Sequence, residues 1–213
     1  MTKLPFETFL DDVMPELPGC PTDLALRHIR RTLNDFGFQT RYLTVWLDPI
    51  STTAGGAAYG IVPTDTDLQL VRPEEVRYNG DELDPVSVDE LNAEEPAWRT
   101  ETGEPRVYTR EDDDQIKLVY IPTSSTTDAL RVKVSVTPDF DATGFAKVFY
   151  DRFADGIAAG VKARLMSMPK KPWSDPATAE KYLRDYQVEV DTAKHLADKS
   201  LSGARRRTRT YYR

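Results

Sequence analysis

The spacing of apolar residues changes twice along this chain, and no other feature limits its fold as strongly. Before Leu43 the apolar residues recur every three or four positions, which is typical of amphipathic helices. Between Thr44 and Pro138 they alternate with polar residues, as in half-buried strands, and then the helical spacing returns. This order predicts an α+β fold, in which N-terminal and C-terminal helices pack as a bundle beside a central antiparallel β-region at 44–138.

Four helices are expected from this spacing, at 5–14, 22–43, 143–168 and 175–200. The second helix carries one buried stripe, which Gly37 interrupts. The third is rich in small residues along its second half, which allows another backbone to approach closely. Ser174 or Asp175 is the expected N-cap of the fourth helix.

Turn signals divide the β-region. Asn79-Gly80 is the strongest hairpin signal, because both residues accept the positive φ values of a type I′ turn. Ser87 and Glu90 form a capping-box pattern that predicts a single helical turn. The acidic run 111–114 is interpreted as a hairpin tip, and the alternation over 130–136 predicts a strand with one wet face.

Charge is distributed unevenly along the chain. The formal net charge is −7, yet residues 199–213 contain six basic residues and no acidic ones. An acidic body therefore precedes a short basic terminal segment. The body should repel nucleic acid, whereas the terminal segment is suited to an acidic partner.

The residue usage predicts a protein that is made and used in a cytoplasm. Cys20 is the single cysteine, so no disulfide can form within one chain. No apolar run approaches the roughly 20 residues of a membrane span. Residues 1–11 lack the basic and apolar regions of a signal peptide. We expect no membrane partner.

Residues with catalytic or ligating chemistry are few, and each has a plainer interpretation. His28 and His195 lie in predicted helices without neighbouring ligands, and Cys20 is a lone thiol in a loop. The acidic run 111–114 lacks the spacing of a calcium loop, and Gly55-Gly56 lacks that of a phosphate loop. We predict no enzyme activity, metal or cofactor, although a site assembled only on folding stays open.

The last ten residues form the most informative segment. We predict a single domain over 1–203, followed by an extended C-terminal arm at 204–213. Three interpretations of the arm are open: a docking arm, an unstructured tail, or a nucleic-acid contact. Arginine and aromatic residues anchor protein interfaces, which favours docking. The residues concerned are Arg205, Arg206, Arg207, Arg209, Tyr211, Tyr212 and Arg213.

Several short motifs, taken in order, resemble those of the head–tail adaptor proteins of tailed bacteriophages, which are also called connector, tail tubular or head-completion proteins. The motifs are Met14–Pro21, Phe36 with Thr40-Arg41, Tyr78–Gly80 followed by Leu83, Ile157–Leu165 and Pro172–Pro176. The similarity in layout covers nearly the whole chain, and none of the motifs is catalytic. Position 37 departs from the family pattern, which favours Cys there.

The resemblance implies a structural protein of the virion neck, assembled in the host cytoplasm. Twelve identical subunits would form a ring below the portal that links the capsid to tail or nozzle proteins. Helices would meet the portal, the β-region would face the tail, and genomic DNA would pass through the lumen without specific binding. The arm would bind the portal, and small residues would pack between subunits: Ala158, Ala159, Gly160 and Ala163. The alternative function is a nucleic-acid-binding accessory protein that uses the basic arm.

Overall fold

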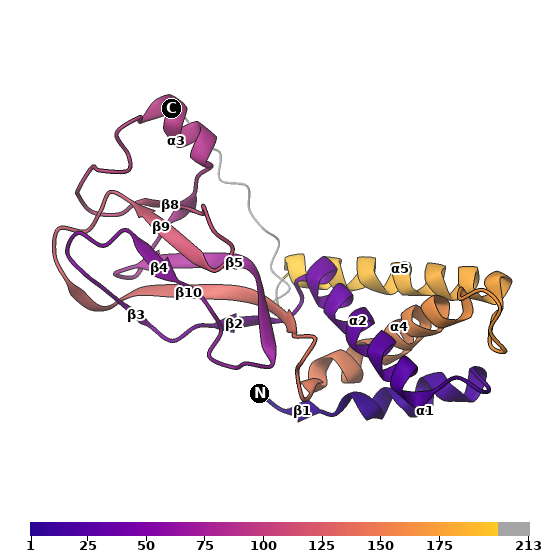
Figure 1. Cartoon of the computed structure of the whole chain (residues 1–213). Helices are drawn as coiled ribbons and strands as arrows, with labels where there is room; N and C mark the ends of the chain where they lie inside the picture. Colours follow the sequence, from indigo (N-terminus) through magenta and orange to yellow (C-terminus); the bar gives the residue numbers. More distant parts are fainter. Residues whose placement is uncertain (200–213) are drawn as a thin grey trace. The chain divides into compact units, whose positions relative to one another are not determined.

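The structure is a computed structural model that describes residues 1–199 (Figure 1). The chain divides into two compact units. Within the described residues, the helical unit contains Met1–Leu43 and 137–199, and the β-unit contains Thr44–Val136. The predicted mixture of helices and strands is confirmed. The predicted single domain over 1–203 stays a prediction, and the arm at 204–213 lies outside the described residues.

The first predicted helix is wrong as a continuous element. In its place are the 3-10 helix η1 (Phe6–Phe9), a single α-helical turn α1 (Leu10–Val13) and the 3-10 helix η2 (Met14–Glu16). Pro15 lies at the start of η2. Proline has no backbone N–H to donate, so α-helical hydrogen bonding does not continue beyond α1. Upstream, strand β1 (Lys3–Leu4) pairs with β11 (Phe145–Ala146).

Helix α2 (Thr22–Thr40) ends three residues before the predicted boundary, because Arg41 adopts a left-handed conformation with φ of 51°. Gly37 does not break this helix. A Cβ built at position 37 would lie 2.3 Å from Oγ1 of Thr137, so glycine allows the end of strand β10 (Thr126–Pro138) to approach α2. The Thr137 hydroxyl donates a 2.8 Å hydrogen bond to the carbonyl of Asn34.

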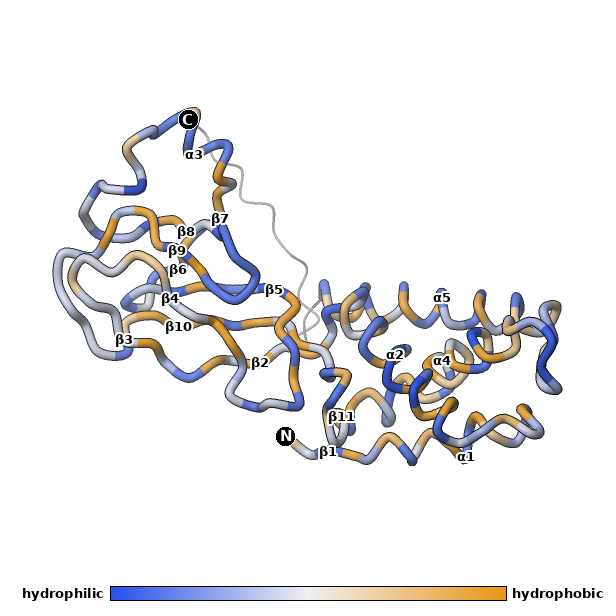
Figure 2. The backbone as a smooth tube through the Cα atoms, in the orientation of Figure 1, coloured by the Kyte–Doolittle hydropathy of each residue, from blue (hydrophilic) through white to orange (hydrophobic). Residues whose placement is uncertain are grey.

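Two long helices complete the helical unit. Helix α4 (Lys147–Met166) begins four residues after the predicted start, because β11 occupies the preceding positions, and it is kinked at Phe153. Helix α5 (Pro176–Lys199) packs along α4. Asp175 caps α5 by accepting a hydrogen bond from the amide of Thr178, as the sequence predicted. Apolar residues recur along α2, α4 and α5 (Figure 2), and buried ones pack between these helices, where the rings of Phe36 and Phe153 lie 5.2 Å apart.

The β-unit contains two sheets. The first has the order β2-β10-β5-β6, with β3 also paired to β10, and the second has the order β4-β9-β8-β7. Strands β7 and β8 are parallel, so the prediction of a wholly antiparallel region is wrong at this edge. The strands are β2 (Thr44–Trp46), β3 (Ile50–Thr52), β4 (Ala58–Gly60), β5 (Leu68–Tyr78), β6 (Asp81–Glu82), β7 (Asp84–Pro85), β8 (Val107–Thr109) and β9 (Gln115–Val119).

The local turn predictions are confirmed. Asn79 and Gly80 have φ values of 51° and 97° and join β5 to β6. The Ser87 side chain caps helix α3 (Val88–Glu94) by accepting from the amide of Glu90, although α3 is longer than one turn. The acidic run 111–114 connects the antiparallel strands β8 and β9.

The prediction of one solvent-exposed face for the strand at 130–136 is wrong at the C-terminal end of that strand. Ser135 has an exposed fraction of 0%, as have its neighbours Val134 and Val136. The Ser135 hydroxyl is satisfied by donating to the carbonyl of Arg72 at 3.2 Å. A small polar side chain that finds a backbone acceptor can therefore occupy a buried position, which alternation alone does not reveal.

Candidate functional site

The residues singled out for their chemistry do not come together. Cys20 is buried, and this burial raises the pKa of its thiol, so the nucleophilic thiolate is disfavoured. His195 is exposed on α5. His28 is half-buried on α2. Within residues 1–199 no three His, Cys, Asp or Glu side chains gather as metal ligands.

The two loop candidates are held by their own contacts. Tyr59 donates a hydrogen bond from its hydroxyl to the carbonyl of Gly56 at 2.9 Å, so the glycine pair is closed by an aromatic side chain rather than open to a phosphate. In the acidic run, Glu111 pairs with Arg99 at 2.9 Å and Lys117 at 3.1 Å. Hydrogen bonds from these two cations lower the pKa of Glu111.

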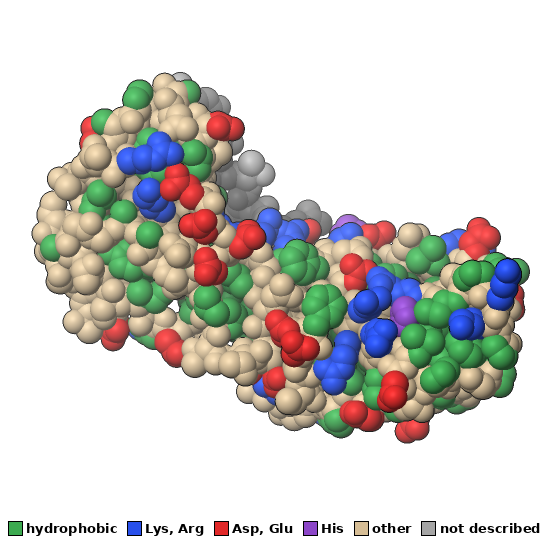
Figure 3. Space-filling model, in the orientation of Figure 1, with side chains coloured by type: hydrophobic (Ala, Val, Ile, Leu, Met, Phe, Trp, Pro, Cys, Tyr) green, Lys and Arg blue, Asp and Glu red, His purple; other side chains and the backbone are tan. Residues whose placement is uncertain are grey.

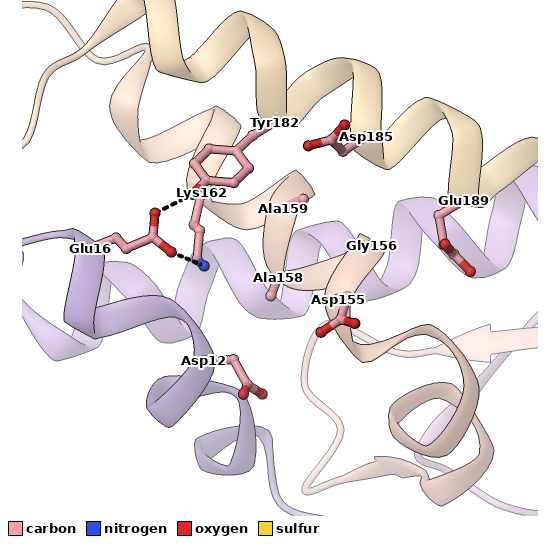
Figure 4. Close-up of a pocket in the computed structure, with 10 residues that line it drawn as sticks. All are labelled: Asp12, Glu16, Asp155, Gly156, Ala158, Ala159, Lys162, Tyr182, Asp185 and Glu189. Atoms are coloured by element: carbon pink, nitrogen blue, oxygen red, sulfur yellow. Dashed lines mark hydrogen bonds and ion pairs between the residues drawn. The ribbon is translucent and has the colours of Figure 1, made fainter.

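The helical unit carries a groove that we call the acidic groove. It has a volume of about 520 Å³ and lies between the N-terminal helical turns, α4 and α5 (Figure 4). Five of its ten lining side chains are carboxylates and one is a lysine. The lining residues are Asp12, Glu16, Asp155, Gly156, Ala158, Ala159, Lys162, Tyr182, Asp185 and Glu189.

One end of the acidic groove is an ordered polar cluster. Glu16 of η2 accepts a 2.6 Å hydrogen bond from Nζ of Lys162 and a second bond from the hydroxyl of Tyr182. The lysine bond is the larger cause of the lowered pKa of Glu16. The carboxylate in turn raises the pKa of Tyr182 to about 12. This cluster joins three elements that are distant in sequence.

The other end of the acidic groove carries uncompensated negative charge. Within the described residues, Asp155, Asp185 and Glu189 have no cationic partner. Burial and the charge of Asp155 raise the pKa of Glu189. Gly156 makes room for this carboxylate, since a Cβ at position 156 would lie 2.3 Å from Cγ of Glu189. Carboxylates held together in this way favour the binding of a cationic group.

The small residues predicted to pack between subunits lie under or beside the groove. Ala158 and Ala159 line its floor. Ala163 is buried, and Gly160 contacts the chain's own α2 and α5, since a Cβ there would lie 2.9 Å from Thr32 and 2.6 Å from Tyr186. A sister subunit therefore has access to Ala158 and Ala159 only through the groove. Their role between subunits stays a prediction.

Sequence reasoning missed the acidic groove. A partial signal was present, because Asp185 and Glu189 are one helical turn apart and share a face of α5. Their meeting with Asp155 of α4 depends on how the two helices pack. The residues predicted to bind the portal all lie outside the described residues: Arg205, Arg206, Arg207, Arg209, Tyr211, Tyr212 and Arg213.

Within residues 1–199 the helical unit carries a charged surface groove. Residues 6–210 match the SU10 adaptor protein family, and the chain belongs to that family. This is a family of phage head–tail adaptors, so the protein has a structural role as a phage adaptor. No curated protein matches the chain. No helix among the described residues is long and apolar enough to cross a membrane.

Proposed function

We propose that this protein forms a ring below the portal of a tailed phage, where it links the capsid to the tail and lets genomic DNA pass. The observation that carries the proposal is the family match over residues 6–210, which includes both the helical and the β-units. Twelve copies would form the ring, in the neck of the virion, after assembly in the host cytoplasm. The helical unit would meet the portal, the β-unit would face tail or nozzle proteins, and no cofactor is needed.

The charge of the chain supports a lumen through which DNA slides. Tight contacts with phosphates depend on Lys and Arg that release counterions from DNA. The chain as a whole carries a formal charge of −7. A ring of such subunits repels the DNA backbone and does not hold it in place.

The arm at 204–213 would bind the portal in this arrangement. The family match extends to residue 210 and so includes most of the arm, which supports a role that the family shares. Five arginines and two tyrosines within ten residues provide bidentate donors and flat aromatic surface. We expect the arm to bind an acidic groove or sheet edge on the portal.

Deleting 204–213 tests this function. The truncated protein should fold with an unchanged circular dichroism spectrum, yet should no longer sediment with purified portal rings. A matched control replaces the five arginines with lysine, which keeps the charge and removes the bidentate geometry. Full docking of the truncated protein contradicts the role of the arm. Failure of the intact protein to bind portal rings contradicts the adaptor function itself.

A second function is favoured by the six basic residues in 199–213. A nucleic-acid-binding accessory protein would use them to contact phosphates, with affinity that falls steeply as salt rises. A gel-shift assay with duplex DNA at low salt decides between the two. Binding that disappears on deletion of 204–213 supports this second function, and absence of a complex excludes it.

A further inference from the structure

The helical unit carries a second charged surface, which we call the basic face. It contains Arg27, His28 and Arg31 of α2 together with Arg164 of α4. Burial lowers the pKa of the His28 imidazole, and the positive charges of Arg31, Arg164 and Arg27 lower it further. Figure 3 shows Lys and Arg side chains gathered over α2. The basic face is therefore a local concentration of positive charge on an acidic protein.

The positive charge on the basic face is largely unneutralised. Arg164 pairs with Asp35. Arg27 and Arg31 are exposed, and neither has an ion-pair partner within residues 1–199. In addition, Nδ1 of His28 is buried without a hydrogen-bond partner in this part of the chain. Exposed guanidinium groups without anionic partners favour the binding of carboxylates from another molecule.

The basic face and the acidic groove lie on opposite sides of α4. Asp155 lines the groove, and Arg164 follows it by nine residues. At 3.6 residues per turn this separation is about two and a half turns, so the two side chains point in opposite directions. A subunit with complementary surfaces on opposite sides can join copies head to tail, which is the arrangement that closes a ring.

We propose that Arg27 and Arg31 of one copy bind the acidic groove of the next copy, so that helical units join head to tail. The inference rests on the proposed ring and names the surfaces that form it. Within the described residues, no cation pairs with Asp155, Asp185 or Glu189, and no anion pairs with the two arginines. One contact between two copies therefore gives both sets of charges a partner. Guanidinium groups bind carboxylates in bidentate geometry, and the floor of Gly156, Ala158 and Ala159 gives them room.

Charge reversal with exchange of partners tests the proposal. The groove variant carries Asp185→Lys and Glu189→Lys, and the face variant carries Arg27→Glu and Arg31→Glu. Like charges then meet in each variant alone, and we expect self-association to weaken by at least ~10-fold. Sedimentation velocity at low salt measures this, with circular dichroism confirming that each variant folds.

Mixing the two variants provides the decisive observation. The lysine-bearing groove of one variant then meets the glutamate-bearing face of the other, and each remaining wild-type surface also finds an opposite charge. The mixture should recover association and form assemblies with alternating copies. A matched control, Arg106→Glu with Arg131→Glu in the β-unit, has the same net charge as the face variant and should associate as the wild type does.

Three outcomes overturn the proposal. They are wild-type association in both variants, no recovery in the mixture although both proteins fold, and a wild type that stays monomeric at low salt. A fourth outcome also overturns it. If deletion of 204–213 abolishes association and the face variant has no effect, the arm binds the acidic groove in place of Arg27 and Arg31. The adaptor function is judged separately by portal docking, so failure of the interface and failure of the function are distinguished.

Discussion

Gly37 of α2 lies so close to Thr137 of β10 that a Cβ at position 37 would come within 2.3 Å of the threonine Oγ1. The glycine costs α2 intrinsic stability, since glycine is about 1 kcal/mol less favourable than alanine within a helix. The cost is offset by contact with a strand that also hydrogen-bonds to α2 through Asn34.

Gly37→Ala should destabilise the protein by about 1–3 kcal/mol, because the added methyl forces the Thr137 backbone and hydroxyl away from α2. Urea unfolding measures the change. Gly60→Ala is the matched control: nothing lies within 4 Å of a Cβ at that position, so its effect should be small. A Gly37→Ala protein that is as stable as the wild type would show that β10 can shift without loss.

Tyr186 has a buried hydroxyl without a hydrogen-bond partner within residues 1–199, while its ring packs against Gly160 and Phe36. Tyr186→Phe removes only the unsatisfied group, so stability should be unchanged or rise by up to about 1 kcal/mol. Tyr186→Ala removes the ring and should cost about 3–5 kcal/mol. Chemical denaturation of both variants checks this. A loss above about 1 kcal/mol in the phenylalanine variant would reveal an acceptor for the hydroxyl.

Glu189 should destabilise the fold at neutral pH. Its pKa is raised in the folded protein by burial and by Asp155, so the folded state binds a proton more readily than the unfolded chain. The associated stability is present below the unfolded pKa of the carboxyl and is lost as pH rises through the folded pKa. Glu189→Gln should therefore be more stable than the wild type at pH 7, with a difference that shrinks near pH 4.

Unfolding in urea at the two pH values measures the effect of Glu189. Glu180→Gln serves as a control, because Glu180 is an exposed residue on the same helix and should show no comparable gain. Asp155→Asn should lower the pKa of Glu189, which NMR titration of the side-chain carboxyl can follow. An equal gain in stability at both pH values would contradict the electrostatic explanation.

Tyr182 should ionise only at strongly alkaline pH, since the Glu16 carboxylate raises its pKa to about 12. The folded state retains the phenol proton more strongly than the unfolded chain does. This contribution to stability is present below pH 10 and is lost as pH rises from 10 through 12. The absorbance titration of the wild type minus that of Tyr182→Phe isolates the group. Glu16→Gln should shift the transition toward pH 10, and an unchanged midpoint would count against the hydrogen bond.

Local features were predictable from the sequence because local interactions control them. The Asn79-Gly80 turn follows from the freedom of these residues to adopt positive φ, and the caps at Ser87 and Asp175 follow from short-range side-chain bonds to backbone amides. The first predicted helix was wrong as a continuous element, because η1 has 3-10 geometry. Pro15 ends α-helical hydrogen bonding after α1, because proline has no backbone N–H to donate.

The buried Ser135 and the acidic groove were not predictable in the same way. Ser135 is polar and occupies an alternating position, and only the nearby carbonyl of Arg72 makes its burial tolerable. The candidate site brings Glu16, Asp155 and Glu189 together from three elements separated by more than a hundred residues at the widest. No spacing rule relates residues so far apart.

The sequence by itself determined the order of helices and strands, the hairpin at Asn79-Gly80 and the surplus of acidic residues, because each depends on neighbours along the chain. The tertiary structure decided which charges meet. Packing of α5 on α4, made possible by Gly156 and Gly160, gathers carboxylates on one side of α4 and leaves Arg164 on the other. Electrostatic interaction depends on distance through space, and only the folded chain sets that distance.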